Sequence, residues 1–287
     1  MSRLVVLAAP AKVNLTLEIV GRRPDGYHEL RSVFATLDLC DRVRVGGAKR
    51  LDVRLHPDPA APAGTELAER AVRLLAARVD RPPWTHVRVA KRIPVAAGLG
   101  GGSSDAATTL RALARLWRLD VDLMGLAAEL GSDVPFFCAA TPFALVEGRG
   151  ERVTPMSAPA DPLWIVLVRV RARVPTAAVY AALRPDEFGH GDASASLAEA
   201  FGAGRVDPAT VRTFVRNDLT DAAARVCREI AETRATAGWK GVTLTLSGSG
   251  PSLFAIADDR RDALRVARIL RGNGLDARAR RLEWPQG

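Results

Sequence analysis

Residues 11–19 alternate strictly between apolar and polar side chains. The apolar positions are Val13, Leu15, Leu17 and Ile19. Since successive side chains of a β-strand point to opposite faces, this alternation predicts a half-buried strand with Lys12 and Asn14 on its polar face. A proline, an aspartate and two glycines within residues 21–26 predict that a turn follows the strand.

The spacing of apolar residues predicts further elements along the chain. Strands are expected at residues 32–39, 42–45, 51–55, 86–90, 143–147, 164–170, 241–246, 252–256 and 276–281. Helices are expected at residues 66–78, 103–117, 122–130, 176–183, 208–215, 218–236 and 261–271, with Asp122 as the N-cap of residues 122–130. Residues 57–64 are expected to form a proline-rich loop, residues 190–196 a mobile polar loop, and residues 155–162 a linker.

The composition is that of a globular protein, because 48% of the 287 residues are apolar and 25% are charged. The longest apolar runs, such as residues 163–168, are far too short to cross a bilayer. The cysteines Cys40, Cys138 and Cys227 are widely spaced and form no CxxC pair. This spacing argues against a disulfide framework and a structural zinc site, and it favours the cytoplasm as the compartment.

The chain has 41 basic and 32 acidic residues, a net charge of +9. The basic residues are scattered, so they suit a phosphate-bearing substrate as well as a nucleic acid. Four of them are lysines: Lys12, Lys49, Lys91 and Lys240. Because this chain uses arginine almost everywhere, a lysine within a motif indicates a place where a compact point charge is needed.

Residues 94–107 contain the strongest motif, in which four glycines lie between a predicted strand and a helix that starts near Ser103. These glycines are Gly98, Gly100, Gly101 and Gly102. Glycine permits positive φ and lets backbone N–H groups converge on an anion, and the helix N-terminus adds its dipole. The motif therefore predicts a site for a di- or triphosphate, with a flexible linker as the alternative. It is neither a Walker A loop nor a Rossmann fingerprint, because no lysine follows the glycines and Ser103 stands at the third glycine position.

Two further segments allow two interpretations each. Residues 246–252 form a second glycine-rich loop, which is either a tight connection or a cap over the same phosphates. Asp133, within residues 131–137, is either a helix cap or a general base near the phosphate loop. Lys12 is either a solvated strand residue or a cation beside a carboxylate.

The turn after the first strand contains Tyr27 and His28. The chain has only one other tyrosine, Tyr180. A Tyr-His pair in an exposed turn can stack on a nucleobase and form hydrogen bonds with its edge, although both residues also occur in ordinary surface turns. The other histidines, His56, His86 and His190, have no metal-ligand spacing, so no metal site is assigned to the protein residues.

Taken together, these motifs resemble the GHMP kinase superfamily, which includes galactokinase, homoserine kinase and mevalonate kinase. The ATP loop of that superfamily, Pro-x-x-x-Gly-Leu-Gly-Ser/Gly-Ser-Ser, matches residues 94–104. Within the superfamily, the chain is most similar to the kinases that act on a cytidine diphosphate-linked methylerythritol. The segments that carry this similarity are residues 9–15, 24–30, 98–107, 131–137, 174–180, 217–219 and 247–251.

The resemblance implies an α+β fold of two domains, residues 1–155 and 163–287, with the active site in the cleft between them. It implies that Lys12 and Asp133 are the catalytic pair. It also implies contacts with the second substrate from Asn14, Tyr27, His28, Thr176 and Tyr180. The implied ATP-binding residues are Pro94, Val95, Ala96, Ala97, Gly98, Leu99, Gly100, Gly101, Gly102, Ser103 and Ser104.

The implied reaction is phosphoryl transfer from ATP, with Mg²⁺ as the second cofactor, to the 2-hydroxyl of the cytidyl substrate. A small molecule is then the expected partner, and neither a nucleic acid nor a membrane is expected. Glu66 stands where the family usually has an asparagine, so an adenosine contact at that position is not carried over. Two alternatives stay open: another GHMP kinase, such as a homoserine or mevalonate kinase, and a basic RNA-binding module without enzymatic activity.

Overall fold

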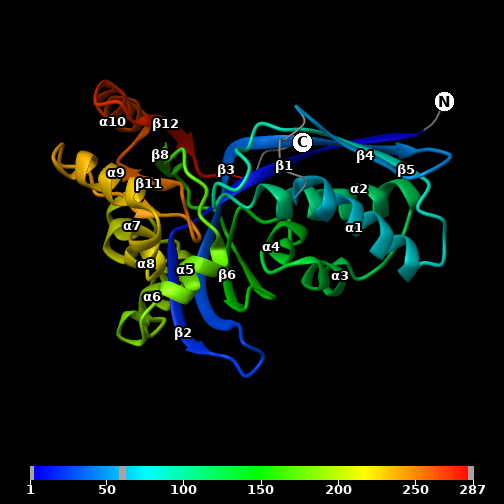
Figure 1. Cartoon of the computed structure of the whole chain (residues 1–287), viewed down its shortest axis with the longest axis horizontal. Coiled ribbons are helices and arrows are strands. Elements are labelled where there is room, and N and C mark those ends of the chain that lie inside the picture. Colours follow the sequence, from blue (N-terminus) through cyan, green and yellow to red (C-terminus); the bar gives the residue numbers. More distant parts are fainter. Residues whose placement is uncertain (1–2, 58–62, 284–287) are drawn as a thin grey trace.

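Two antiparallel-rich sheets organise the chain, of which the computed structural model describes residues 3–57 and 63–283 (Figure 1). The larger sheet contains β1 (Leu4–Asn14), β2 (Thr16–Arg22), β3 (His28–Gly47), β4 (Asp52–His56), β5 (Thr85–Ala90), β6 (Phe143–Gly148), β7 (Arg152–Met156) and β9 (Arg216–Asn217). The smaller sheet contains β8 (Trp164–Arg169), β10 (Thr245–Leu246), β11 (Leu253–Ala257) and β12 (Asp276–Arg281).

The helices fall into two groups in chain order (Figure 1), and α6 of the second group packs on β2 and β3 of the larger sheet. The first group is α1 (Ala63–Arg78), α2 (Gly101–Trp117), α3 (Leu123–Leu130) and α4 (Val134–Cys138). The second group is α5 (Thr176–Ala182), the 3-10 turn η1 (Pro185–Glu187), α6 (Asp192–Gly202), α7 (Pro208–Phe214), α8 (Leu219–Val226), α9 (Arg228–Gly238) and α10 (Arg260–Gly272). The two sheets and their helices confirm the predicted α+β class.

The long strand β3 is the centre of the larger sheet. It pairs antiparallel with β1, β2, β5 and β6 along its 20 residues. At the far edge, β9 pairs parallel with the start of β2, with Thr16 opposite Arg216 and Leu17 opposite Asn217. The N-terminal and C-terminal halves of the chain are therefore joined by backbone pairing.

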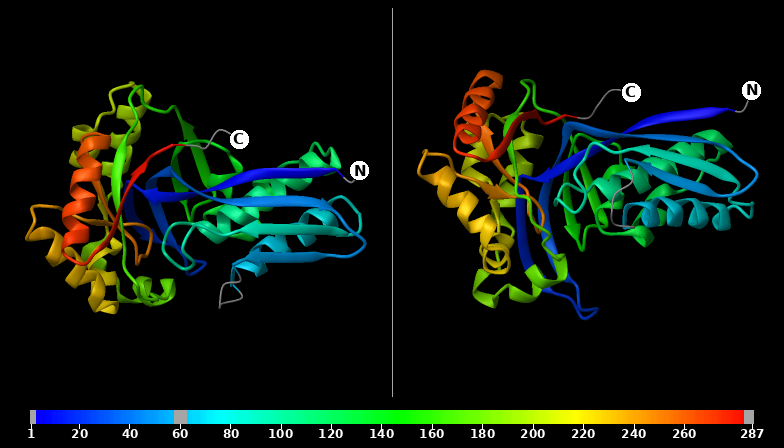
Figure 2. Two further views of the ribbon diagram at one scale, coloured as in Figure 1. Left: turned by 90° about the horizontal axis from the view of Figure 1, so that it is seen from above. Right: turned by 45° about the horizontal axis from the view of Figure 1, so that its top comes forward.

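Within residues 3–57 and 63–283, three hydrophobic cores hold these layers together. In the first, the inner face of β3 and β5 packs on α1 and α2, which lie on one face of this sheet (Figure 2). In the second, β8, β11 and β12 pack against α5, α8 and α10. The third core lies between the two halves and contains residues such as Val13, Val33, Phe143, Ile165 and Phe254. Because this central core is fully buried, it fixes how the two halves face each other.

Most predicted elements are confirmed within a few residues. Asp122 is the N-cap of α3, where its side chain accepts hydrogen bonds from the backbone N–H groups of Met124 and Gly125 at 2.8 Å and 3.3 Å. The strands predicted at residues 32–39 and 42–45 are parts of the single strand β3. The helix predicted at residues 218–236 is two helices, α8 and α9, because Cys227 is extended with φ −135° and ψ 104°.

Two expectations were wrong for the same reason: those for the polar face of residues 11–19 and for the loop at residues 190–196. The polar face of residues 11–19 is not solvated, since Asn14 and Glu18 are each only 1% exposed. Residues 190–196 are not a mobile loop, because Gly191, with φ 83°, starts helix α6 and Ser194 is completely buried. Ser194 donates from its backbone N–H and its hydroxyl to Glu18 Oε2, at 2.8 Å and 2.7 Å. The polar face of the strand is therefore covered by α6.

The predicted domain limits, residues 1–155 and 163–287, stay a prediction. Strand β7 ends at Met156 and β8 begins at Trp164, which leaves a short connection between them. Leu17 and Ile19, from the first half of the chain, belong to the second core. Most of the predicted proline-rich loop, residues 57–64, lies outside the described residues. Among the helices that the structure describes, none is long and apolar enough to cross a membrane.

Candidate active site

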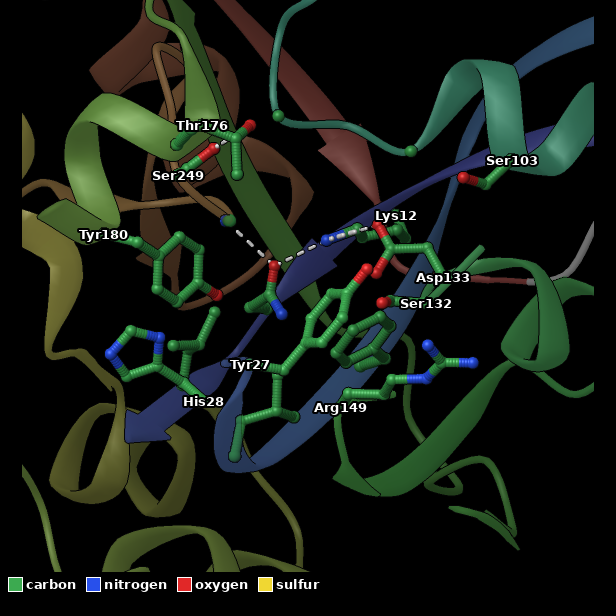
Figure 3. A pocket seen from close by; sticks show the side chains of 18 of the residues that line it. Lys12, Tyr27, His28, Ser103, Ser132, Asp133, Arg149, Thr176, Tyr180 and Ser249 are labelled. Carbon is green, nitrogen blue, oxygen red and sulfur yellow. Dashed lines mark hydrogen bonds and ion pairs between the residues drawn. The ribbon is translucent and has the colours of Figure 1, made fainter. Parts of the chain in front are cut away.

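A cavity of about 790 Å³ lies where the two halves meet. Figure 3 shows its labelled side chains, which come from β1, the β2–β3 turn, the start of β3, α2, the residues just before α4, the β6–β7 turn, α5 and the second glycine loop. The lining residues that carry polar or aromatic groups are Lys12, Asn14, Arg22, Tyr27, His28, Phe34, Ser103, Ser132, Asp133, Arg149, Thr176, Tyr180 and Ser249. Among these described residues, the cations are Lys12, Arg22 and Arg149 and the one carboxylate is that of Asp133, so the lining is suited to a polyanion.

Lys12 and Asp133 meet at the centre of this cavity. Lys12 Nζ lies 3.4 Å from Asp133 Oδ2, and the lysine side chain is 4% exposed whereas that of Asp133 is 32% exposed. Lys12 Nζ also lies 4.5 Å from the centre of the Phe34 ring. Lys12 is thus a buried cation beside a carboxylate, and the alternative of a solvated strand residue is wrong.

Asp133 occupies the N-cap position of α4, as its alternative interpretation predicted, yet its side chain forms no capping hydrogen bond. The carboxylate is directed to Lys12 instead, with part of its surface open to the cavity (Figure 3). A carboxylate that is held by a lysine and open on one side can accept a proton from a bound hydroxyl group. The geometry therefore fits the general-base interpretation better than the capping one.

Asn14 connects the lysine to the second glycine loop. Its Oδ1 accepts hydrogen bonds from Lys12 Nζ at 2.8 Å and from the backbone N–H of Gly248 at 2.9 Å. Its Nδ2 donates to Ser32 Oγ at 3.0 Å. Asn14 lines the cavity as predicted for a substrate contact, but in this structure its polar atoms also position the lysine.

The first glycine loop needs glycine at two positions for backbone conformation. Gly98 has φ 74° and Gly100 has φ 69°. A Cβ on Gly98 would lie 2.4 Å from the carbonyl oxygen of Ser247, and one on Gly100 would lie 2.9 Å from Phe137 Cζ. Gly101 and Gly102 already belong to helix α2. The expectation of positive φ therefore holds for the first two glycines and not for the last two.

Helix α2 directs its N-terminus to the cavity. The left-handed residue Gly100 precedes it, and its first-turn N–H groups have no acceptor within the helix. Gly98, Gly100 and Ser103 line the cavity, whereas Ala97, Leu99 and Ser104 are buried. This arrangement of backbone donors and a helix dipole can bind a phosphate group.

The second glycine loop packs directly on the first. Ser247 Oγ donates to the carbonyl oxygen of Gly98 at 3.0 Å, and the backbone N–H of Ser252 donates to that of Ala97 at 3.2 Å. Gly248 has φ 57°, and Gly248 and Ser249 line the cavity. The structure thus brings the two loops together, so residues 246–252 are more than a tight connection between strands.

Aromatic rings occupy the other end of the cavity. Tyr27 is 51% exposed on the β2–β3 turn, whereas Tyr180 on α5 is half-buried (Figure 3). The rings of His28 and Tyr180 are 5.0 Å apart and tilted by 34°. Burial, followed by the charge of the nearby Arg22, lowers the pKa of His28. Burial, followed by the charge of Asp133, raises the pKa of Tyr180.

Sequence reasoning did not assign five of the lining side chains: Arg22, Phe34, Ser132, Arg149 and Ser249. The guanidinium carbon of Arg149 lies 5.4 Å from the centre of the Tyr27 ring, within the range of a cation–π contact. Ser249 Oγ lies 2.9 Å from the hydroxyl oxygen of Thr176, one of the predicted substrate contacts. Gly148 and Gly150, with φ 75° and 127°, flank Arg149. An arginine framed by two glycines is the sequence signal that could have identified it.

The described residues contain no group of three or more His, Cys, Asp or Glu that could hold a metal ion. Mg²⁺ in nucleotide sites usually needs only one or two carboxylates, because phosphate oxygens and water supply its other ligands. Asp133, partly exposed in the cavity, is a carboxylate of this kind. The donor set therefore fits a Mg²⁺ ion that arrives with the nucleotide.

Comparison with known proteins agrees with this geometry. The family described as GHMP kinases N terminal domain matches residues 66–141, and the family described as GHMP kinases C terminal matches residues 197–275. The class defined by the fold and the site is thus that of the GHMP kinases, which are ATP-dependent small-molecule phosphotransferases.

Curated relatives narrow this class. The chain is 39% identical to the 4-diphosphocytidyl-2-C-methyl-D-erythritol kinase of Shouchella clausii over 93% of this chain and 90% of that protein. It is 40% identical to the kinase of the same name from Ralstonia nicotianae over 90% of this chain and 87% of that protein. The chain belongs to the 4-diphosphocytidyl-2-C-methyl-D-erythritol kinase family.

Solved structures give the same result. A crystal structure of 4-(cytidine 5'-diphospho)-2C-methyl-D-erythritol kinase matches with a TM-score of 0.79 and 38% identity, over 97% of this chain and 99% of that one. Homoserine kinase from Cytophaga hutchinsonii matches with a TM-score of 0.76 but only 16% identity, over 98% of this chain and 95% of that one. The likeness to homoserine kinase is one of fold alone. Family membership favours the predicted kinase over the homoserine, mevalonate and RNA-binding alternatives.

Proposed function

We propose that the cavity transfers the γ-phosphoryl group of ATP to the 2-hydroxyl of 4-diphosphocytidyl-2-C-methyl-D-erythritol, in the non-mevalonate pathway to isoprenoid precursors. The observation that carries the proposal is the 3.4 Å contact of Lys12 and Asp133. This pair lies between the start of helix α2 on one side and the rings of His28 and Tyr180 on the other (Figure 3). The cavity thus offers one end to a nucleoside triphosphate and the other to a nucleobase.

The proposed chemistry assigns one role to each member of the pair. Asp133 accepts the proton of the 2-hydroxyl as its oxygen attacks the γ-phosphorus, and the bond to the β–γ bridging oxygen breaks to release ADP. Lys12 keeps Asp133 ionised and offsets the negative charge that develops on the transferred group. Mg²⁺ would be held mainly by the phosphates of ATP, beside the carboxylate of Asp133, and would supply charge neutralisation when bound.

The predicted substrate contacts have matching roles. Tyr27 and Tyr180 face the base, and His28 offers a hydrogen bond to its edge. Residues 94–104 receive the phosphates of ATP through their backbone, with Ser247 supporting Gly98 from the second loop. A cytoplasmic location is part of the same proposal and stays a prediction.

The test is a coupled assay of ADP formation with three acceptors: the cytidyl methylerythritol, homoserine and mevalonate. We expect kcat/KM for the cytidyl acceptor to exceed the other two by at least about a thousand-fold, because unpaired polar groups in the site reject acceptors without the base. An Asp133→Asn variant is the control for contaminating kinases. Comparable kcat/KM values for homoserine or mevalonate would overturn the assignment of the acceptor.

A further inference from the structure

A buried cluster of ion pairs lies at the base of the phosphate loop, outside the cavity. Lys91 follows β5, and its side chain is 8% exposed. Its Nζ donates to Asp41 Oδ2 on β3 and, at 2.6 Å, to Asp105 Oδ2 on α2. Both carboxylates are completely buried. None of these three side chains lines the cavity, so they do not belong to the site described above.

The cluster attaches both ends of the loop to one point of the sheet. Asp41 Oδ1 accepts hydrogen bonds from the backbone N–H groups of Arg92 and Ile93, where the chain leaves β5. Asp105 lies in the second turn of α2, where the chain has just entered the helix. Since Lys91 joins the two carboxylates, residues 94–100 run between two fixed ends.

Gly101 allows the helix to approach this cluster. It does not have positive φ, but a Cβ at this position would lie 3.0 Å from Ile93 Cγ2 and 3.5 Å from Lys91 Nζ. Three of the four loop glycines therefore have identified functions: Gly98 and Gly100 set the backbone conformation, and Gly101 permits close packing on Lys91 and Ile93.

Such a cluster is a poor source of general stability. Burying charges costs free energy that their mutual attraction only partly returns, so apolar residues of the same volume would serve stability at least as well. Asp105 Oδ1 accepts no hydrogen bond from the described part of the chain. Burial, opposed by Lys91, raises the pKa of Asp105 to about 7. What the ion pairs provide is a single geometry for the segments that they join.

We propose that Asp41, Lys91 and Asp105 are positioning residues for ATP, whose ion pairs hold residues 94–100 in the conformation that receives the phosphates. This inference rests on the proposed function in taking that loop as the phosphate site. If the cluster is broken, the loop populates other conformations. The apparent dissociation constant for ATP then rises in inverse proportion to the fraction of molecules whose loop can still bind the phosphates. Asp133 lies on another element, so turnover at saturating ATP is retained.

The test uses Asp41→Asn and Asp105→Asn, which replace a carboxylate partner of Lys91 by an amide of the same shape. The assay is run above pH 7, where the carboxyl of Asp105 is ionised. We expect the KM for ATP to rise about ten-fold or more, which corresponds to a competent loop fraction of about a tenth. The kcat at saturating ATP and the KM for the acceptor should change less than about three-fold. An unchanged KM for ATP in both folded variants would overturn the proposal.

A matched control separates positioning from loss of stability. Asp218 is also a buried carboxylate that accepts hydrogen bonds from two backbone N–H groups, those of Ile19 and Gly189, both at 2.8 Å. It is not part of the loop or the cavity lining. Asp218→Asn should lower the melting temperature and leave the KM for ATP unchanged. An equal rise in that KM would show a general folding effect and refute the proposal.

Two further measurements cover the case in which Asp41→Asn does not fold and separate this proposal from the proposed function. If Asp41→Asn does not fold, amide hydrogen exchange of the parent enzyme without nucleotide replaces it: protection at residues 92–101 supports the fixed loop, and exchange as fast as in an unstructured peptide refutes it. Gly100→Ala distinguishes this proposal from the proposed function. If only Gly100→Ala weakens ATP binding, the cluster proposal alone fails. If no variant weakens it, the phosphate site itself is wrong.

Discussion

The two ends of the cavity are built differently. At the glycine loop, the proposed phosphate side, backbone groups and buried charges set the geometry of the site. At the proposed base side, partly exposed aromatic rings set it. Gly98 and Gly100 offer N–H groups from a loop whose ends meet buried carboxylates. Tyr27, by contrast, is 51% exposed at the tip of a hairpin. The triphosphate of ATP does not vary, so a rigid loop of backbone N–H groups is sufficient to bind it. A base must be told apart from other bases, and side chains on a turn can provide that selection.

The contrast predicts how substitutions act on each side. A change in the phosphate loop alters backbone conformation and has no side chain to restore it. A change on the base side removes one contact and leaves the scaffold in place. The predictions below test this contrast, beginning with the pair of residues that lies between the two sides.

Asp133→Asn should lower kcat by about a thousand-fold or more, because an amide cannot accept the hydroxyl proton. ATP affinity should change little, since the phosphate loop and its helix are untouched. The measurements are kcat by the coupled assay and the dissociation constant for ATP by titration. Near-normal turnover in a folded variant would restore the capping interpretation of Asp133.

Gly100→Ala should raise the KM for ATP by roughly ten-fold to a hundred-fold. A non-glycine residue at φ 69° costs about 1–2 kcal/mol. Its Cβ would also lie 2.9 Å from Phe137 Cζ and 3.0 Å from Lys12 Cγ. Gly102→Ala is the matched control, because its Cβ would meet only Leu67 Cδ1 at 3.5 Å. Similar KM values for the two variants would remove the backbone argument for this loop.

The pH dependence of stability should report the buried charges of the phosphate side. Asp105 has a pKa of about 7 in the folded protein against 3.8 for the unfolded chain, so the folded state holds a proton that the unfolded state releases between these values. The free energy of unfolding therefore falls as pH rises from about 4 to about 7, by up to about 1.4 kcal/mol per pH unit from this group.

Asp105→Asn provides the comparison, because an amide does not titrate. Urea unfolding of parent and variant at several pH values should give a smaller decline for the variant over this window. Parallel curves for the two proteins would mean that the carboxyl of Asp105 is already ionised at pH 4.

Much of this contrast could be predicted from the sequence, and the reason for each failure is physical. Local patterns identified the phosphate loop, because glycines before a helix act through their own backbone. The Lys12–Asp133 pair joins residues 121 positions apart, so its proximity came from the family resemblance and not from periodicity. The burial of Glu18 under Ser194 was missed because alternation says which residues share a face, and it cannot say what covers that face. The two glycines beside Arg149 could have pointed to it, but its contact with the distant Tyr27 could not be predicted, because the fold brings them together.

The smallest effects are expected on the base side, where Tyr27→Ala and Tyr180→Ala should each raise the KM for the cytidyl acceptor by roughly ten-fold. Stacking of a base on an aromatic ring contributes about 1–3 kcal/mol per contact, and 1.4 kcal/mol corresponds to a factor of ten. The KM for ATP should stay within about two-fold, because the phosphate loop lies on the opposite side of Lys12 and Asp133.

The Tyr27→Ala and Tyr180→Ala variants should have similar effects on substrate specificity but different effects on protein stability. Tyr180 is half-buried against His28, with ring centres 5.0 Å apart, so its truncation should also lower the melting temperature. The exposed Tyr27 contacts Arg149 and should be replaced without loss of stability. Each variant is assayed against both substrates. Equal KM rises for ATP and the acceptor would indicate a folding defect, and an unchanged acceptor KM in both variants would refute the assignment of this end of the cavity to the base.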